Sequence, residues 1–287
     1  MRVHHIVELL PILLPCYQIS YTFGKISYTD LLAVAELCFP INELWETVSK
    51  AKPWSLPVQQ RHWQGNSRIA GQSGARVVLH ARRTDRLQMI VSTIRRNGGA
   101  AFSLETDVTQ SNDLKKRVKL AMEKFSKPEV MINNAGIAQL YRMEELDLEG
   151  WEQMIDVNLK GTLYGIAAAL PEFKKQGSGY IINITSTAGI AIVPAMGVYA
   201  GTKNAVRTRS EALRQESEGR WRVTGISPGY VKSAFVNNIK NESLRNANQQ
   251  KADEISIPAA VIARAVAYAV EQPDNVYDIV VRSSVQG

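Results

Sequence analysis

The sequence predicts an α/β fold in which a doubly wound parallel sheet carries helices on both faces. The first observation is that short apolar runs alternate with amphipathic helical segments from Gly74 onward. The second is that small, polar or glycine residues follow four consecutive apolar runs, where sheets of this kind bind ligands. The third is the length, because 287 residues suit one such domain with an extension.

Each expected strand is a short apolar run, and each expected helix has a periodic apolar face. We expect strands at Arg76–Ala81, Ala101–Thr106, Val130–Ile132, Tyr180–Thr185, Val223–Ser227 and Asp278–Val281. We expect helices at Thr84–Asn97, Ser111–Phe125, Leu148–Phe173, Val198–Glu218 and Pro258–Glu271. Gly98 and Gly99 close the first helix, and Ser111 is the expected N-cap of the second.

Residues 1–62 form a divergent extension with no recognisable chemistry, so the α/β domain is expected over residues 63–287. The histidines of the extension have no partners at metal-ligand spacing, and no metal site is predicted. Both cysteines, Cys16 and Cys38, lie in the extension. A fold without a disulfide framework is typical of a reducing compartment, and we expect a cytoplasmic protein.

The net charge of +7 comes from dispersed lysines and arginines. Nucleic-acid binding is not expected, because no basic run is interleaved with aromatic residues. Stable membrane insertion is not expected either, because no apolar run reaches the ~18 residues of a membrane span. The positive charge is better suited to small molecules that carry phosphate.

Three residues within one stretch indicate a site for acid–base chemistry. Tyr199 and Lys203 are four apart, so on a helix the phenol and the ammonium share one face. A cation beside a phenol lowers its pKa, which lets a tyrosine exchange protons near neutral pH. Ser186 ends an apolar strand thirteen residues upstream and can hold a carbonyl oxygen. The pair alone is a weak motif, since Tyr21 and Lys25 match it too.

The four strand ends predict a crevice along one edge of the sheet. Each carries residues that let a ligand approach, and in each case a simple turn is the alternative. They are Asp107-Val108, Asn133-Asn134-Ala135-Gly136, Ser186, and Ser227-Pro228-Gly229.

With these motifs in their order, the chain from about Gly74 to Gly287 resembles the classical short-chain dehydrogenases/reductases. The resemblance rests on the first three strand-end motifs, on Asn158 within Val157–Gly161, on Tyr199 with Lys203, and on Pro228-Gly229. The ending Ile279–Arg282 is similar to the 3-hydroxy-acid and clavaldehyde-type branch. The resemblance implies a Rossmann-like fold.

The resemblance also implies residue roles. Tyr199 would be the catalytic acid/base, Lys203 would lower its pKa and bind the nicotinamide ribose, Ser186 would orient the carbonyl, and Asn158 would keep a proton-relay water in place. Asn158 alone could instead satisfy a helix backbone.

A nicotinamide dinucleotide is the implied cofactor. Asp107 and Val108 would border its adenine, Asn134 and Gly136 its adenosine side, and Val231 and Ser233 its nicotinamide amide. Ser233 stands where the family commonly has threonine.

Charge at the end of the first expected strand favours NADP(H) over NAD(H). A strand that selects NAD ends in Asp or Glu, which holds the ribose 2′-hydroxyl. Here Ala81 is followed by Arg82 and Arg83, whose guanidinium groups can pair with a 2′-phosphate. The alternative is two solvated arginines opening a helix, where the helix dipole disfavours cations.

The chain departs from the family at its start. The family opens with a buried strand and Thr-Gly-x-x-x-Gly-x-Gly, whereas Gly65, Gly71 and Gly74 do not fit that spacing. The first βα unit is therefore interpreted as truncated, with a degenerate glycine loop. Either the start is mis-spliced or mis-predicted, or the chain is a divergent product that has lost pyrophosphate binding.

The sequence thus predicts an NADP(H)-dependent oxidoreductase that interconverts a secondary alcohol and its ketone or aldehyde. The alternative is a catalytically impaired family member that acts as a binding or regulatory protein. Substrate contacts are expected from Ala188–Gly197 and from a mobile lid over Phe235–Ile255, which favour a small polar substrate. The resemblance implies a homodimer or homotetramer through the helices starting near Leu148 and Val198.

Overall fold

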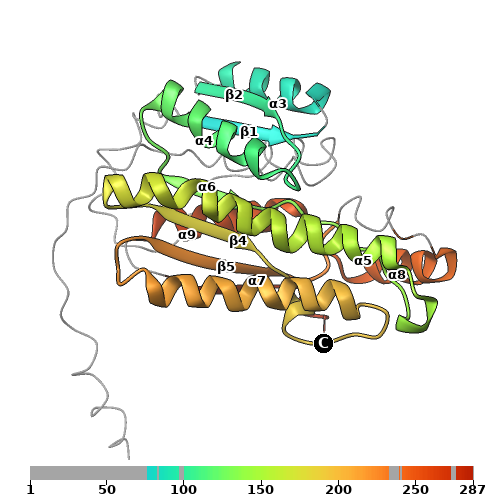
Figure 1. Cartoon of the computed structure of the whole chain (residues 1–287). Coiled ribbons are helices and arrows are strands. Elements are labelled where there is room, and N and C mark those ends of the chain that lie inside the picture. Colours follow the sequence, from blue (N-terminus) through green and yellow to red (C-terminus); the bar gives the residue numbers. More distant parts are fainter. Residues whose placement is uncertain are drawn as a thin grey trace, which may run out of the picture.

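The computed structural model describes residues 76–82, 84–96, 100–232, 239, 241–272 and 276–286. Its parallel strands alternate with helices, which confirms the predicted α/β class (Figure 1). The strands are β1 Arg76–Ala81, β2 Ala100–Glu105, β3 Val130–Asn133, β4 Tyr180–Ile184, β5 Arg222–Pro228 and β6 Asp278–Val281. The α-helices are α3 Thr84–Arg96, α4 Ser111–Phe125, α5 Leu148–Met154, α6 Gly161–Gln176, α7 Gly197–Glu216, α8 Glu242–Ile255 and α9 Ala259–Glu271.

The described strands fall into two parallel sheets. One pairs β1 with β2, and the other has the order β3-β4-β5-β6. Figure 1 shows β1 and β2 grouped with α3 and α4, apart from β4 and β5. Helix α4 joins the two groups, because it contacts both β1 and α6. The Arg117 side chain of α4 contacts His80 of β1 and Met131 of β3.

The core lies on both faces of the larger sheet. Successive residues of a strand point to opposite faces, and in β4 both faces are filled. Ile181 packs with Phe173 of α6 on one face. Ile182 packs with Ile262 of α9 on the other. All but the last residue of β4 is buried, as expected for a central strand of a doubly wound sheet.

Most of the expected elements are confirmed, with ends that shift by a few residues. The expected long helix Leu148–Phe173 is interrupted by a π-helical segment, η3, over Ile155–Lys160. Gln110, and not Ser111, is the N-cap of α4. Within the segment expected as a lid, the described residues form the regular helix α8, with Asn241 as its N-cap. The glycines expected to close α3 lie outside the described residues.

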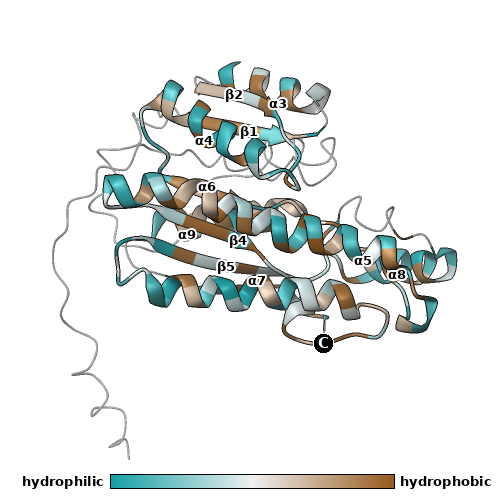
Figure 2. Cartoon of the chain, in the orientation of Figure 1, coloured by the Kyte–Doolittle hydropathy of each residue, from teal (hydrophilic) through white to brown (hydrophobic). Residues whose placement is uncertain are grey.

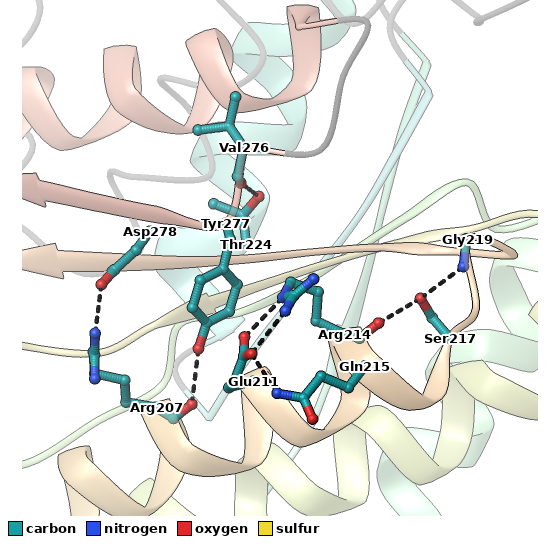
Figure 3. Close-up of polar contacts among 10 residues, drawn as sticks. All are labelled: Arg207, Glu211, Arg214, Gln215, Ser217, Gly219, Thr224, Val276, Tyr277 and Asp278. Carbon is teal, nitrogen blue, oxygen red and sulfur yellow. Dashed lines mark hydrogen bonds and ion pairs between the residues drawn. The ribbon is translucent and has the colours of Figure 1, made fainter.

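Polar contacts attach the edge strand β6 to α7 (Figure 3). Arg207 of α7 pairs with Asp278 at 2.9 Å, and the Tyr277 hydroxyl donates to the Arg207 carbonyl at 3.2 Å. One turn further along, Arg214 binds both carboxylate oxygens of Glu211 at 2.7 Å. The Arg207 contacts attach α7 to the edge of the sheet, whereas the Arg214–Glu211 pair lies within the helix itself.

The described residues contain neither a candidate membrane span nor a candidate metal cluster. None of their helices combines the length and the apolar character needed to cross a membrane. Within the same part of the chain, no group of three or more His, Cys, Asp or Glu side chains is placed to hold a metal ion.

Candidate active site

Strand β4 and helix α7 bring the three predicted acid–base residues together. Helix α7 begins at Gly197, so Tyr199 and Lys203 lie on successive turns of one face, and both side chains are buried. Ser186 follows β4 in extended backbone geometry. Its Oγ accepts a hydrogen bond from the Ala188 amide at 3.1 Å and caps the 3-10 turn Thr187–Gly189.

Tyr199 is buried in an apolar cluster, and its phenol is hydrogen-bonded to Ser186. Its buried neighbours include Leu140, Met154 and Ala188. Burial disfavours the phenolate and raises the pKa of Tyr199, whereas the hydrogen bond with Ser186 acts in the opposite direction. The expected lowering of the pKa was therefore wrong for this structure, because desolvation outweighs the polar contact.

The Lys203 ammonium lies at the end of β4. Its Nζ donates to the Ile184 carbonyl at 2.9 Å. It also lies over Gly136, since a Cβ on that glycine would be 3.2 Å from Nζ and 3.5 Å from Asn158 Oδ1. The ammonium, the Asn158 amide and the bare Gly136 backbone therefore meet at one point.

Asn158 is fully buried within the π-helical segment and joins three elements. Its Oδ1 accepts from the Ile137 amide at 2.8 Å, and its Nδ2 donates to the Ile137 carbonyl at 2.9 Å. The same Nδ2 donates to Thr202 Oγ1 at 3.1 Å. The side chain thus fixes the loop after β3 against α7. A π segment inside a helix frequently occurs at a functional site.

The predicted adenine-side residues lie at the ends of the β1–β2 sheet. The Thr106 amide donates to the Ala81 carbonyl at 3.2 Å, so the exposed Arg82 and the half-buried Asp107 follow neighbouring strand ends. Asp107 Oδ1 accepts from the backbone and the hydroxyl of Thr109. Val108 lies against the start of α6, where a Cβ on Gly161 would be 3.0 Å from it.

The remaining predicted cofactor residues are only partly described. Val231 forms an isolated parallel bridge with Ile257, and Asn134 is half-buried directly after β3. Arg83 and Ser233 lie outside the described residues. The structure thus brings Ser186, Tyr199 and Lys203 together with Asn158 and Gly136. It does not describe the positions of Arg83 and Ser233.

Sequence reasoning missed several residues that support the site. Thr202 accepts the Asn158 amide, and the Ile184 carbonyl receives Lys203. Behind them, Asn133 donates to Asn183 and Asn183 to Ser210, each at 2.8 Å. Asn133 was expected only as part of a strand-end motif. The available signal for this pairing was Asn183 within an expected buried strand, since a buried amide requires partners.

The described residues around Gly136 and Lys203 fit a bound dinucleotide. Gly136 offers backbone without a side chain, and the three N–H donors of Lys203 lie beside it. A side chain at residue 136 would occupy this space. The segment with Gly65, Gly71 and Gly74, where the family binds pyrophosphate, lies outside the described residues.

Comparisons with known proteins agree with this geometry. The family model for short chain dehydrogenases matches residues 67–244. An uncharacterised oxidoreductase of Staphylococcus saprophyticus is 39% identical over 227 residues, covering 76% of this chain and 89% of that protein. One from Listeria monocytogenes is 41% identical over 211 residues, covering 72% and 85%. The chain therefore belongs to the short-chain dehydrogenase/reductase family of oxidoreductases.

Solved structures share the fold. An alcohol dehydrogenase from the archaeon Thermococcus sibiricus, complexed with 5-hydroxy-NADP, has a TM-score of 0.67 and 26% identity, covering 78% of this chain and 92% of that one. A serine dehydrogenase complexed with NADP+ has a TM-score of 0.68 and 28% identity, covering 78% and 91%.

Proposed function

We propose that this protein is an NADP(H)-dependent oxidoreductase that interconverts a secondary alcohol and its ketone. The observation that carries the proposal is the buried Ser186–Tyr199 hydrogen bond with the Lys203 ammonium on the next turn. This arrangement offers two hydroxyl donors to one carbonyl oxygen. A carbonyl oxygen placed beside both hydroxyls would lie within hydrogen-bond reach of the acid that protonates it.

In the reductive direction NADPH, when bound, would supply the hydride for the carbonyl carbon and would leave as NADP+. The Ser186 hydroxyl donates a hydrogen bond that orients the carbonyl oxygen. Tyr199 transfers its phenolic proton to that oxygen as the C=O double bond becomes a C–O single bond. In the oxidative direction, the phenolate takes the proton from the alcohol.

Lys203 and Asn158 position the site. The Lys203 ammonium, on the same helix face as Tyr199, favours the phenolate that forms when the proton leaves. Asn158 holds the Ile137 backbone and Thr202, so that the loop after β3 and α7 keep their spacing. A water held near Asn158 would return the proton to Tyr199.

Two observations support NADP(H) over NAD(H). Arg82 is exposed at the end of β1, where a dinucleotide-binding strand meets the ribose, and no acid follows this strand directly. The related serine dehydrogenase was solved with NADP+. Arg82 and Arg83 would pair with the 2′-phosphate, while Asp107, Val108, Asn134, Gly136, Val231 and Ser233 would border the rest of the cofactor.

Titration of the purified full chain with NADPH and NADH, followed by nicotinamide fluorescence, tests this proposal. We expect NADPH to bind. The double variant Arg82→Ala, Arg83→Ala should lower the affinity for NADPH about ten-fold or more and change the affinity for NADH little. Arg142→Ala, at an exposed arginine of another loop, is the matched control. An equal loss for both cofactors would remove the 2′-phosphate argument.

The irregular glycines at Gly65, Gly71 and Gly74 favour a second candidate. A chain that has lost pyrophosphate binding would be a catalytically impaired binding or regulatory protein, or a mis-spliced product. No NADPH binding at millimolar concentration would support this second candidate over the enzyme.

We also propose that the protein is a cytoplasmic homodimer or homotetramer, assembled through α5, α6 and α7. Light scattering coupled to size exclusion measures the assembly. A monomer at micromolar concentration would contradict it.

A further inference from the structure

The loop between Ser186 and Tyr199 lies beside the reacting groups, because the hydrogen bond between these two residues joins its ends. Residues 187–198 contain no ionisable side chain. Ile190, Ile192 and Val193 are exposed there, Ile192 by 83%. Figure 2 shows the hydrophobic colour of this loop where it enters α7. The loop is therefore an uncharged, apolar wall next to the catalytic hydroxyls.

A second apolar segment completes the surface. The Tyr141 amide donates to the Ala195 carbonyl at 3.0 Å and ties the loop after β3 to this wall. A Cβ on Gly197 would be 3.4 Å from the Met143 sulfur. Met143 and Leu146 are exposed by 56% and 67%. We call Met143, Leu146, Ile190, Ile192 and Val193 the apolar rim.

The charges around the apolar rim are unfavourable to an anion. Residues 142–152 carry five acids and one arginine. Helix α8 borders this segment, since Asn241 Nδ2 donates to Glu145 Oε2 at 3.3 Å. Two described cations of α8 are engaged, Arg245 near Glu242 and Lys251 over the Tyr230 ring. Arg142, the one arginine of residues 142–152, pairs with Glu144 at 3.7 Å, so a carboxylate or phosphate on the substrate would meet mainly acids and uncharged side chains on this side.

We propose that the substrate is an uncharged carbonyl compound, or its alcohol, with an apolar substituent of several carbons that packs on the apolar rim. This inference rests on the proposed function of the same site. It replaces the small polar substrate expected from sequence, because that expectation used the composition of residues 235–255 and not the exposed side chains of the loop between Ser186 and Tyr199. Exposed apolar patches of this kind commonly mark ligand contacts.

A matched series of ketones tests the proposal with the full chain and NADPH. 2-Butanone and 2-octanone differ in chain length, and 7-oxooctanoate replaces the terminal methyl of 2-octanone by a carboxylate. We expect kcat/KM for 2-octanone to exceed that for 2-butanone about ten-fold or more, since each buried methylene contributes about four-fold. We expect the oxo acid to be about ten-fold or more worse than 2-octanone, because its charge must be desolvated.

The variant Ile192→Ser separates the apolar rim from the catalytic groups. It should lower kcat/KM for 2-octanone about five-fold or more and leave kcat/KM for 2-butanone unchanged. Met89→Ser, at an exposed methionine of α3, is the control and should change neither value. A flat chain-length series, a preference for the oxo acid, an equal loss on both ketones or an altered oligomeric state in Ile192→Ser would each overturn the proposal.

Saturation-transfer NMR of 2-octanone with the protein distinguishes this inference from the proposed function, because it requires neither NADPH nor turnover. Binding that Ile192→Ser weakens supports the apolar rim even in a chain that is inactive. Absence of binding overturns the inference. Turnover without any chain-length preference would leave the oxidoreductase proposal standing and the apolar rim refuted.

Discussion

At the scale of single residues, Tyr199 experiences two opposing effects. Burial in the apolar cluster with Leu140 and Met154 raises the pKa of Tyr199, and the hydrogen bond with Ser186 lowers it. Burial is the larger effect, so the phenol keeps its proton at neutral pH. A protonated phenol is the form that reduces a ketone, whereas alcohol oxidation requires the phenolate.

A pH prediction follows from this raised pKa. Ketone reduction should stay constant from about pH 6 to 8 and fall only in the alkaline range, above the ordinary tyrosine pKa of about 10. Alcohol oxidation should rise with pH over the same alkaline range. Ser186→Ala removes the contact that lowers the pKa of Tyr199. It should therefore move both the fall of the reduction rate and the rise of the oxidation rate to higher pH. Initial rates in both directions measure this, and oxidation that is maximal at or below pH 7 would contradict it.

At the scale of elements, close packing of glycine against polar side chains holds α6 on β3. A Cβ on Gly165 of α6 would be 2.0 Å from Asn133 Oδ1. Asn133 begins the buried amide series through Asn183 to Ser210. The backbone of α6 can therefore approach β3 only because residue 165 has no side chain.

Two Gly→Ala substitutions on neighbouring helices should have opposite effects. Gly165→Ala must displace Asn133 and should lower the free energy of unfolding by about 1–3 kcal/mol. Gly201→Ala on α7 meets nothing within 4 Å and should raise that free energy by about 0.5–1 kcal/mol, as expected for an exposed helix. Urea titration followed by circular dichroism measures both. Equal changes in the free energy of unfolding for the two variants would contradict the role of the packing between Gly165 and Asn133.

The elements also show what the sequence could predict. The spacing of Tyr199 and Lys203 predicted one helix face, and the apolar run before Ser186 predicted the strand that delivers it; both are confirmed. The contacts of Asn158 with Ile137 could not be predicted, because a periodic pattern does not reveal pairing across 21 residues of loop and helix. The direction of the pKa shift at Tyr199 depends on burial, which short-range spacing does not report.

At the scale of the whole molecule, the described strands belong to two sheets that differ in strand pairing and burial. Strands β4 and β5 are paired on both sides and nearly fully buried. Strands β1 and β2 pair only with each other among the described residues. Their link to the rest runs through α4, including the buried Arg117. Strand pairing and burial differ between regions of most proteins, and they determine the free energy of local unfolding.

Hydrogen exchange should therefore separate the two sheets. We expect the amides of β4 and β5 to exchange only through global unfolding, and those of β1 and β2 to exchange about ten-fold faster or more. Arg117→Leu should accelerate amide exchange in β1 and β2 further, because Arg117 links β1 to β3. Amide exchange in β4 should be unchanged. Mass spectrometry of peptic peptides measures this, and equal protection of all four strands would contradict it.

The central claim is that Tyr199 is the acid/base of an NADP(H)-dependent reaction, and Tyr199→Phe tests it most directly. The variant keeps the aromatic ring in its apolar cluster and removes the hydroxyl that binds Ser186. NADPH titration and kcat with 2-octanone are measured on the same preparations of the parent chain and the variant. We predict that NADPH affinity stays within about two-fold while kcat falls about 100-fold or more. A variant that retains turnover would contradict the role of Tyr199.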